Sequence, residues 1–124
     1  DNFGHDKGDE MIKRVADMLS SICRETDTLS RMGGDEFIIL LASTDSGQAK
    51  AAVDRIRREE KKLFLAFTEK NNEKISIPIR FSIGVGGSDE GPPEKVMKIA
   101  DQRMYIDKEN FYQKTINNLY SGHS

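Results

Sequence analysis

The sequence predicts an α+β domain in which helices pack on a mostly antiparallel sheet. Two observations lead to this fold class. Apolar residues recur at helical spacing over residues 7–25 and again after residue 93. Between these segments, short apolar runs typical of strands are separated by turn residues, most clearly at Gly33-Gly34.

The first half of the chain predicts a helix followed by a β-hairpin. Thr28–Met32 alternates as a half-buried strand does, and Phe37–Leu41 is a continuous apolar run that suits a buried strand. The two glycines between them allow positive φ angles, which a tight hairpin turn needs. The preceding helix carries its apolar residues at helical spacing: Met11, Ile12, Val15, Ala16, Leu19, Ile22 and Cys23.

A second helix is predicted to begin at Thr44–Gly47 and to continue as far as Phe67. We expect its charged middle, Arg55–Lys62, to face mostly solvent. The residues expected on its apolar face are Ala49, Ala52, Val53, Ile56, Leu63, Phe64 and Phe67.

The last third of the chain predicts strands and then a third helix. Ile75–Ile79 and Phe81–Gly86 are the strand segments, with Pro78 marking an edge or an irregularity. Gly91-Pro92-Pro93 precedes the helix, because proline suits the first helical turn. The helix has an apolar set formed by Val96, Met97, Ala100 and Met104.

Length and composition predict one cytoplasmic domain, either of a cytoplasmic protein or of the cytoplasmic part of a larger, membrane-bound sensor. We expect it over residues 1–115, with a C-terminal tail over 116–124, because the helical pattern weakens there. The net charge of −2 disfavours nucleic-acid binding. No apolar run approaches the length of a membrane span, no leader resembling a signal peptide is visible, and the single cysteine excludes an intramolecular disulfide.

The hairpin turn holds the residues best suited to chemistry. Gly33 and Gly34 would let a ligand approach the backbone, and Asp35 and Glu36 place two carboxylates beside them. Mg²⁺ commonly binds one or two carboxylates together with substrate phosphates. This pattern therefore suits metal-assisted phosphoryl chemistry. The alternative is an ordinary tight turn with solvated acids.

Four segments together resemble the GGDEF domain family, the diguanylate cyclases. Arg31–Phe37 resembles the signature of the family. The Gly-His-x-x-Gly-Asp segment at residues 4–9, Ser82–Val85, and Ala100-Asp101-x-x-Met104-Tyr105-x-x-Lys108 match further family motifs. They occur in the order and spacing of the family over about residues 1–112.

The resemblance implies a fold related to the polymerase palm and to nucleotidyl cyclases. It also implies the condensation of two GTP molecules into cyclic di-GMP with release of pyrophosphate. Each domain would bind one GTP, and two domains would meet face to face as a homodimer. Mg²⁺ or Mn²⁺ would stabilise the attacking and leaving oxygens.

The resemblance also implies roles at the hairpin. Asp35 would bind metal and help to deprotonate the 3′-hydroxyl, with Glu36 assisting. Gly33 and Gly34 would let the hairpin lie against the nucleotide.

Two residues outside the hairpin would bind substrate by the same resemblance. Asp9 would accept hydrogen bonds from guanine, and Lys108 would contact the triphosphate. The alternatives are an acid favoured by the helix dipole for Asp9 and a solvated helix-end lysine for Lys108.

A second motif implies product inhibition. Arg24-x-x-Asp27 ends five residues before Gly33, which is the register of the inhibitory site of the family. Arg55 stands where the family has another arginine of that site. These residues would bind cyclic di-GMP through its phosphates and guanine edges. The alternative is a surface ion pair worth less than about 1 kcal/mol.

Two departures from the family bear on activity. The family has a strand before the segment that begins at Asp1, in the middle of its sheet, with further metal, phosphate and guanine ligands. We expect this first central strand to be missing from the chain, so that the 124 residues alone are not competent. The other departure is Tyr112, which replaces the arginine that usually follows Lys108 by four residues.

Two functions follow from this pattern. The first is a diguanylate cyclase domain joined to an upstream sensory or regulatory domain. The alternative is a non-catalytic receptor for GTP or cyclic di-GMP that regulates a neighbouring domain. The intact Gly33–Phe37 segment favours catalysis, and Tyr112 favours the receptor.

Overall fold

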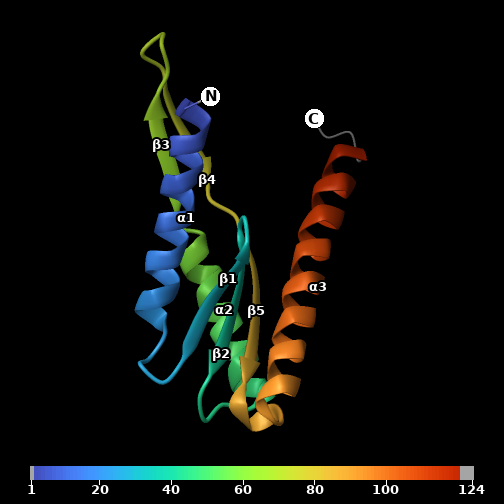
Figure 1. Cartoon of the computed structure of the whole chain (residues 1–124). Helices are drawn as coiled ribbons and strands as arrows, with labels where there is room; N and C mark the ends of the chain where they lie inside the picture. The colour runs from blue at the N-terminus through green and yellow to red at the C-terminus, as the bar shows by residue number, and fades with distance from the viewer. Residues whose placement is uncertain (1, 121–124) are drawn as a thin grey trace.

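The computed structural model describes the backbone of residues 2–120 and the side chains of residues 8–111, 113 and 117. Within that range the chain forms helices, strands and one short 3₁₀ helix (Figure 1). The helices are α1 (Asn2–Ile22), α2 (Ser46–Glu60), α3 (Pro93–Tyr120) and the 3₁₀ helix η1 (Ser88–Glu90). The strands are β1 (Thr28–Gly33), β2 (Glu36–Leu41), β3 (Phe64–Thr68), β4 (Lys74–Pro78) and β5 (Ser82–Gly87).

The strands form two separate sheets. β1, β2 and β5 lie side by side in that order, with β1 antiparallel and β5 parallel to β2. β3 and β4 form an antiparallel ribbon of their own. The α+β class and the hairpin are confirmed, although the larger sheet is mixed rather than purely antiparallel. No gap for a missing central strand is open among the described strands, because β2 and β5 pair directly, from Glu36↔Ser82 to Leu41↔Gly87.

Helices cover both faces of the larger sheet. Alternation along β2 explains the two layers, because successive side chains point to opposite faces. Phe37 and Ile39 belong to the main core, which α1 and α2 cover. Ile38 packs instead with Ala100 and Met104 of α3, on the opposite face (Figure 1).

The contact between β5 and α3 is very close. A Cβ atom on Gly84 would lie 1.9 Å from the carbonyl oxygen of Ala100 and 2.5 Å from the backbone nitrogen of Met104. No side chain fits in that space, so glycine is required for the helix to approach the strand.

Charged side chains cover the outer edge of β5. An unpaired strand edge invites association, and side chains that occupy its backbone groups prevent this. Alternate residues of β5 make such bonds: Ile83 N–H to Asp107 Oδ2 at 2.9 Å, Val85 C=O to Arg103 Nη1 at 2.8 Å, and Gly87 N–H to Glu90 Oε2 at 2.8 Å. The long helix α3 is thereby bonded to the strand on which it packs.

The second helix is shorter than predicted. It begins as expected, where Asp45 and Gln48 form reciprocal capping bonds of 2.8 and 3.0 Å. It ends at Glu60, however, and Phe64 opens β3, which pairs with β4. The extension to Phe67 was therefore wrong, because residues 63–67 are a continuous apolar run whose spacing does not distinguish a helix from a strand.

The charge run on α2 does not lie wholly in solvent. Glu60 is buried, with 5% exposure, and accepts a hydrogen bond from Arg57 at 2.9 Å. Arg57 also pairs with Asp107 and lies over the ring of Phe81, 5.2 Å from its centre. The expectation of a mostly solvated face fails at Glu60, since a buried carboxylate requires partners of this kind. It holds for the exposed side chains of Arg55, Arg58, Lys61 and Lys62.

At the C-terminus, α3 continues to Tyr120, so residues 116–120 of the expected tail are helical and residues 121–124 lie outside the described range. The division into a domain over 1–115 and a tail stays a prediction. Among the described residues, no helix combines the length and the apolar character needed to cross a membrane.

Candidate functional site

The tip of the β1–β2 hairpin is a two-residue turn. Gly33 pairs with Glu36, which leaves Gly34 and Asp35 at the tip. Gly34 has a φ of +24°, in the region that favours glycine. Arg31 steadies the turn by donating from Nε to the Gly34 carbonyl at 2.8 Å. Asp35 is consequently exposed on a defined turn rather than on a loose loop.

The backbone of Asp35 also joins the hairpin to β5. Its carbonyl accepts a hydrogen bond of 2.9 Å from the amide of Ser82, the first residue of β5. The carboxylate of Asp35 is therefore carried on backbone that is fixed on two sides, by the turn and by the neighbouring strand.

A cavity of about 460 Å³ joins three of the residues singled out in the sequence. Asp9 of α1 lies in its wall with Gly34 and Asp35 of the hairpin. Arg31 and Arg80 add two guanidinium groups to the same wall. The remaining lining residues are Gly8 and the apolar Met11, Ile12, Val15 and Ile79. An apolar floor with a few polar groups is typical of a small-molecule site.

Glu36 and Lys108 lie close to each other. Lys108 Nζ is 2.6 Å from Glu36 Oε2, and both side chains are partly exposed. Neither residue lines the cavity of Asp9 and Asp35. Lys108 therefore lies beside the hairpin but outside the cavity wall, and its contact with a triphosphate stays a prediction.

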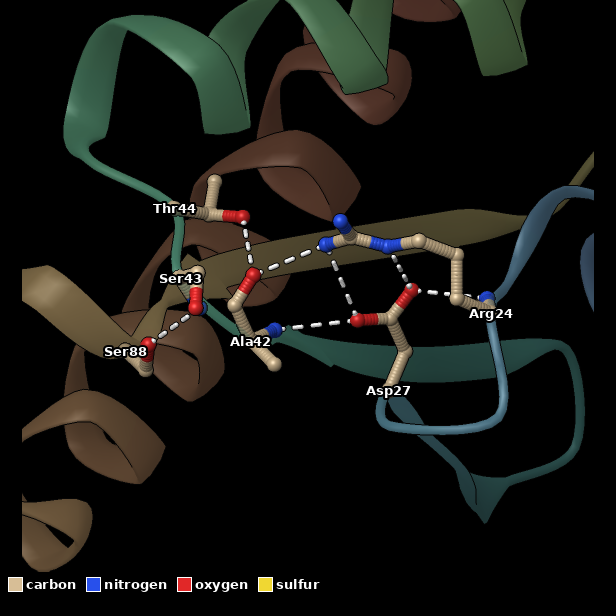
Figure 2. Close-up of polar contacts among 6 residues, drawn as sticks. All are labelled: Arg24, Asp27, Ala42, Ser43, Thr44 and Ser88. Atoms are coloured by element: carbon tan, nitrogen blue, oxygen red, sulfur yellow. Dashed lines mark hydrogen bonds and ion pairs between the residues drawn. The ribbon is translucent and has the colours of Figure 1, made fainter.

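Arg24 and Asp27 form a network that also holds backbone groups (Figure 2). Asp27 Oδ2 accepts from the Arg24 amide at 2.8 Å, and Oδ1 accepts from the Ala42 amide at 2.9 Å. The guanidinium of Arg24 lies 3.3 Å from both oxygens and donates to the Ala42 carbonyl at 2.8 Å. Thr44 Oγ1 donates to that same carbonyl at 2.8 Å. The network joins the turn after α1 to the end of β2.

Burial differs sharply within this pair. The Asp27 side chain is 1% exposed, whereas that of Arg24 is 59% exposed. Burial alone would raise the pKa of Asp27, but the hydrogen bonds from the Arg24 and Ala42 amides and from the Arg24 side chain outweigh it, so the pKa is lowered. The alternative of a weak surface ion pair between Arg24 and Asp27 does not fit, because the Asp27 carboxylate is buried. Any ligand at this motif would meet the exposed side of Arg24.

Arg55 is exposed on α2, and its place in an inhibitory site stays a prediction. The side chain of Tyr112 lies outside the described residues.

A divalent metal ion such as Mg²⁺ would need oxygen ligands from this site. Among the described side chains, no three His, Cys, Asp or Glu residues are grouped as metal ligands. Mg²⁺ often takes only one or two carboxylates and completes its shell with phosphates and water. The exposed Asp35 in a cavity wall fits that pattern as a single protein ligand, whereas Glu36 is already paired with Lys108.

Sequence reasoning missed one residue of the cavity entirely. Arg31 was part of the signature segment, although no role was assigned to it. Arg80 lies between β4 and β5 and belongs to no motif. Nothing in the local pattern marked it, because only the folded chain brings it to the hairpin.

The cavity wall thus combines an exposed carboxylate on a glycine turn with two guanidinium groups. The family model described as "Diguanylate cyclase, GGDEF domain" matches residues 1–114. The chain therefore belongs to the GGDEF domain family of diguanylate cyclases.

Curated relatives agree with this family. The chain is 32% identical over 120 residues to the "Probable diguanylate cyclase DgcT" of Escherichia coli K12, covering 94% of this chain and 25% of that protein. It is 32% identical over 112 residues to "Diguanylate cyclase A" of Treponema denticola, covering 89% and 29%. It is 34% identical over 109 residues to "Diguanylate cyclase DosC" of Escherichia coli K12, covering 87% and 23%.

The chain thus spans about a quarter of the length of these relatives. No solved structure matches the chain significantly.

Proposed function

We propose that this chain is the catalytic domain of a diguanylate cyclase, which condenses two GTP molecules into cyclic di-GMP and releases two pyrophosphates. The observation that carries the proposal is the cavity that joins Asp9, Gly34 and Asp35. These residues come from α1 and from the hairpin, and the family resemblance gives all three a part in binding one nucleotide. Because the reaction consumes GTP, we place the domain in the cytoplasm.

Each residue has a defined part in this proposal. The carboxylate of Asp9 accepts hydrogen bonds from the N1–H and amino groups of guanine, a donor pair that adenine lacks. Gly33 and Gly34 keep the hairpin free of side chains where the nucleotide approaches. Asp35 accepts the proton of the 3′-hydroxyl, assisted by Glu36. A divalent ion held by Asp35 and the phosphates would, when bound, stabilise negative charge on the reacting oxygens.

The phosphate-binding part of the site involves Lys108. Its ammonium group lies 2.6 Å from Glu36, so contact with a triphosphate requires it to exchange that carboxylate for phosphate oxygens. Each domain supplies one GTP, and two copies of the domain meet so that each 3′-hydroxyl attacks the α-phosphate of the other.

A further strand would complete the palm-like sheet of the family. The resemblance places it in the middle of the sheet, before Asp1. β1 and β2 are joined by a two-residue turn, which leaves no room for a strand between them. We therefore propose that it enters between β2 and β5, where it would replace their parallel pairing. The activity assay consequently uses a protein extended upstream of Asp1.

The test is formation of cyclic di-GMP from GTP and Mg²⁺ by the extended protein. Asp35→Asn keeps the shape of the side chain and removes its charge, so we expect the product to disappear. Glu73→Gln, in the exposed β3–β4 turn, is the matched control and should retain activity. No product from the unsubstituted protein, together with tight binding of GTP or cyclic di-GMP, would favour the receptor.

We also propose product inhibition through Arg24, Asp27 and Arg55. The exposed guanidiniums of Arg24 and Arg55 would hold the phosphates or guanine edges of cyclic di-GMP. Arg24→Ala and Arg55→Ala should each weaken inhibition by added product, with Arg58→Ala as the control on α2. Unchanged inhibition in both variants would show that Arg24 and Asp27 serve the fold alone.

A further inference from the structure

We propose that Asp107 positions Lys108 for the phosphates of the nucleotide, by fastening the turn of α3 that carries both residues to β5 and to α2. The inference rests on the proposed function, which gives Lys108 its contact with the triphosphate. Lys108 follows Asp107 in the sequence, so bonds that fix Asp107 also fix the backbone of Lys108. Asp107 is a positioning residue in this proposal, since it acts only through its neighbour.

Two other elements hold the carboxylate of Asp107. Its Oδ2 accepts a hydrogen bond of 2.9 Å from the amide of Ile83 in β5. The same oxygen pairs with the guanidinium of Arg57 in α2. Both side chains of this pair are about three-quarters shielded, with 28% exposure for Asp107 and 27% for Arg57. A partly buried, charge-assisted bond of this kind is stronger than an exposed ion pair.

Arg57 is itself anchored, so it gives Asp107 a fixed partner. Its Nη1 donates to Glu60 Oε2 at 2.9 Å and to the Phe81 carbonyl at 3.1 Å, which leaves Nη2 for Asp107. A planar fork that serves three acceptors at once keeps a defined direction, which a flexible ammonium group does not. One guanidinium therefore joins α2, the residue before β5, and α3.

These contacts lie on the edge of β5 that points away from β2. The amide of Ser82 bonds to the Asp35 carbonyl on the hairpin side. Successive residues of a strand direct their backbone groups to opposite edges, so the amide of Ile83 points to the other edge, where Asp107 accepts it. A strand that enters between β2 and β5 would leave these bonds in place. Lys108 would then move together with β5 and α2.

The direction of the effect separates positioning from charge. Asp107 places a negative charge beside a residue that would bind phosphates, so on charge alone its removal should strengthen nucleotide binding. If Asp107 positions Lys108, its removal should weaken that binding. Glu109 is exposed on the same helix and follows Lys108 directly. Glu109→Ala therefore removes an equal charge next to Lys108 and is the matched control.

The experiment measures nucleotide binding by calorimetry in the protein extended upstream of Asp1. The probe is 3′-deoxy-GTP with Mg²⁺, which lacks the attacking hydroxyl and is not consumed. Asp107→Ala should weaken its binding about threefold or more, whereas Glu109→Ala should leave it unchanged or tighter. Asp107→Asn keeps an oxygen for the Ile83 amide without the charge, so it should lie between Asp107→Ala and the unsubstituted protein.

A double-mutant cycle with Lys108→Ala identifies the residue through which Asp107 acts. In the Lys108→Ala protein, adding Asp107→Ala should change binding by less than about twofold, because no ammonium group remains to be positioned. Equal weakening with and without Lys108 would indicate a general disturbance of the fold and overturn the inference. Unchanged or tighter binding in Asp107→Ala would also overturn it, as would unchanged binding in Lys108→Ala.

The proposed function can fail separately. If the probe binds through Lys108 and Asp107 as expected but GTP yields no cyclic di-GMP, the cyclase assignment fails and the positioning role stands. If GTP is converted to cyclic di-GMP but Asp107→Ala binds the probe as well as the unsubstituted protein does, the cyclase stands and the positioning role fails.

Discussion

Replacement of Asp27 tests whether the Arg24-x-x-Asp27 motif holds the fold together. Its carboxylate accepts from two backbone amides, those of Arg24 and Ala42, at 2.8 and 2.9 Å. Only 1% of the side chain is exposed, so water cannot readily replace these bonds. Asp27→Ala leaves both amides without their acceptor and detaches the α1–β1 turn from the end of β2.

The expected loss can be worked from these contacts. A hydrogen bond to a charged group contributes about 1.5–3 kcal/mol, so two buried bonds give a loss of about 3–6 kcal/mol for Asp27→Ala. Arg24→Ala removes an exposed guanidinium but keeps the backbone amide that Asp27 binds. We expect it to cost about 1 kcal/mol. The free energy of unfolding of a domain of this size is about 5–15 kcal/mol. The loss expected for Asp27→Ala is a large part of that total, whereas the loss expected for Arg24→Ala is a small part of it.

Urea unfolding of the two variants and the unsubstituted protein measures this difference. The pH dependence gives an independent check, because the folded-state pKa of Asp27 is lowered. Its contribution is complete above the unfolded pKa of about 3.9 and is lost as the pH falls through the folded value. The difference in free energy of unfolding between the unsubstituted protein and Asp27→Ala should therefore become smaller as the pH falls into the acid range. A loss below about 1 kcal/mol at neutral pH would refute the structural role.

Three further predictions concern stability. Gly84→Ala places a Cβ 1.9 Å from the Ala100 carbonyl oxygen and should cost about 3 kcal/mol or more in urea unfolding, so a neutral result would contradict the close contact with α3. Gly8→Ala meets nothing within 4 Å inside α1 and should raise stability by about 0.5–1 kcal/mol, which a fall in the melting temperature would disprove. The hydrogen bond from Arg103 lowers the pKa of Glu90, whose contribution is complete above about 4.3 and lost as the pH falls through the folded value. In Glu90→Gln, the melting temperature should therefore fall less between neutral pH and pH 3 than it does in the unsubstituted protein. An equal fall in both proteins would show that the Glu90–Arg103 pair does not cause the acid sensitivity.

The elements with clear local signals were the ones the sequence could predict. The helical spacing after residue 7 marked α1, and the two glycines marked the hairpin. Prolines at 92 and 93 marked the start of α3. The residues 63–67 gave no such signal, because a continuous apolar run fits a strand and a buried helix equally well. Pairing with β4 decided in favour of a strand, and that pairing is tertiary information.

The parallel pairing of β2 with β5 could not be predicted from the sequence for a related reason. Neither strand carries a residue that specifies its neighbour, and α2, β3 and β4 lie between them in the chain. Arg80 was missed in the same way. The resemblance could supply Asp9 and Asp35, whereas Arg80 acquires a place in the cavity only when the connection after β4 folds against α1 and the hairpin.

The hairpin itself explains why the site residues divide into two groups. Asp35 lies at the tip and lines the cavity, whereas the next residue, Glu36, is the first of β2 and pairs with Lys108 of α3. Successive residues at the start of a strand point to opposite sides, so adjacency in the sequence separates their carboxylates in space. A nucleotide held by Asp9 and Asp35 therefore reaches Lys108 only if its phosphates extend around the hairpin or if the Glu36–Lys108 pair opens. An upstream strand between β2 and β5 would move β5 and the helix α3 that packs on it, and with them Lys108. The position of that strand, rather than the chemistry of Lys108, would therefore set how the two halves of the site meet.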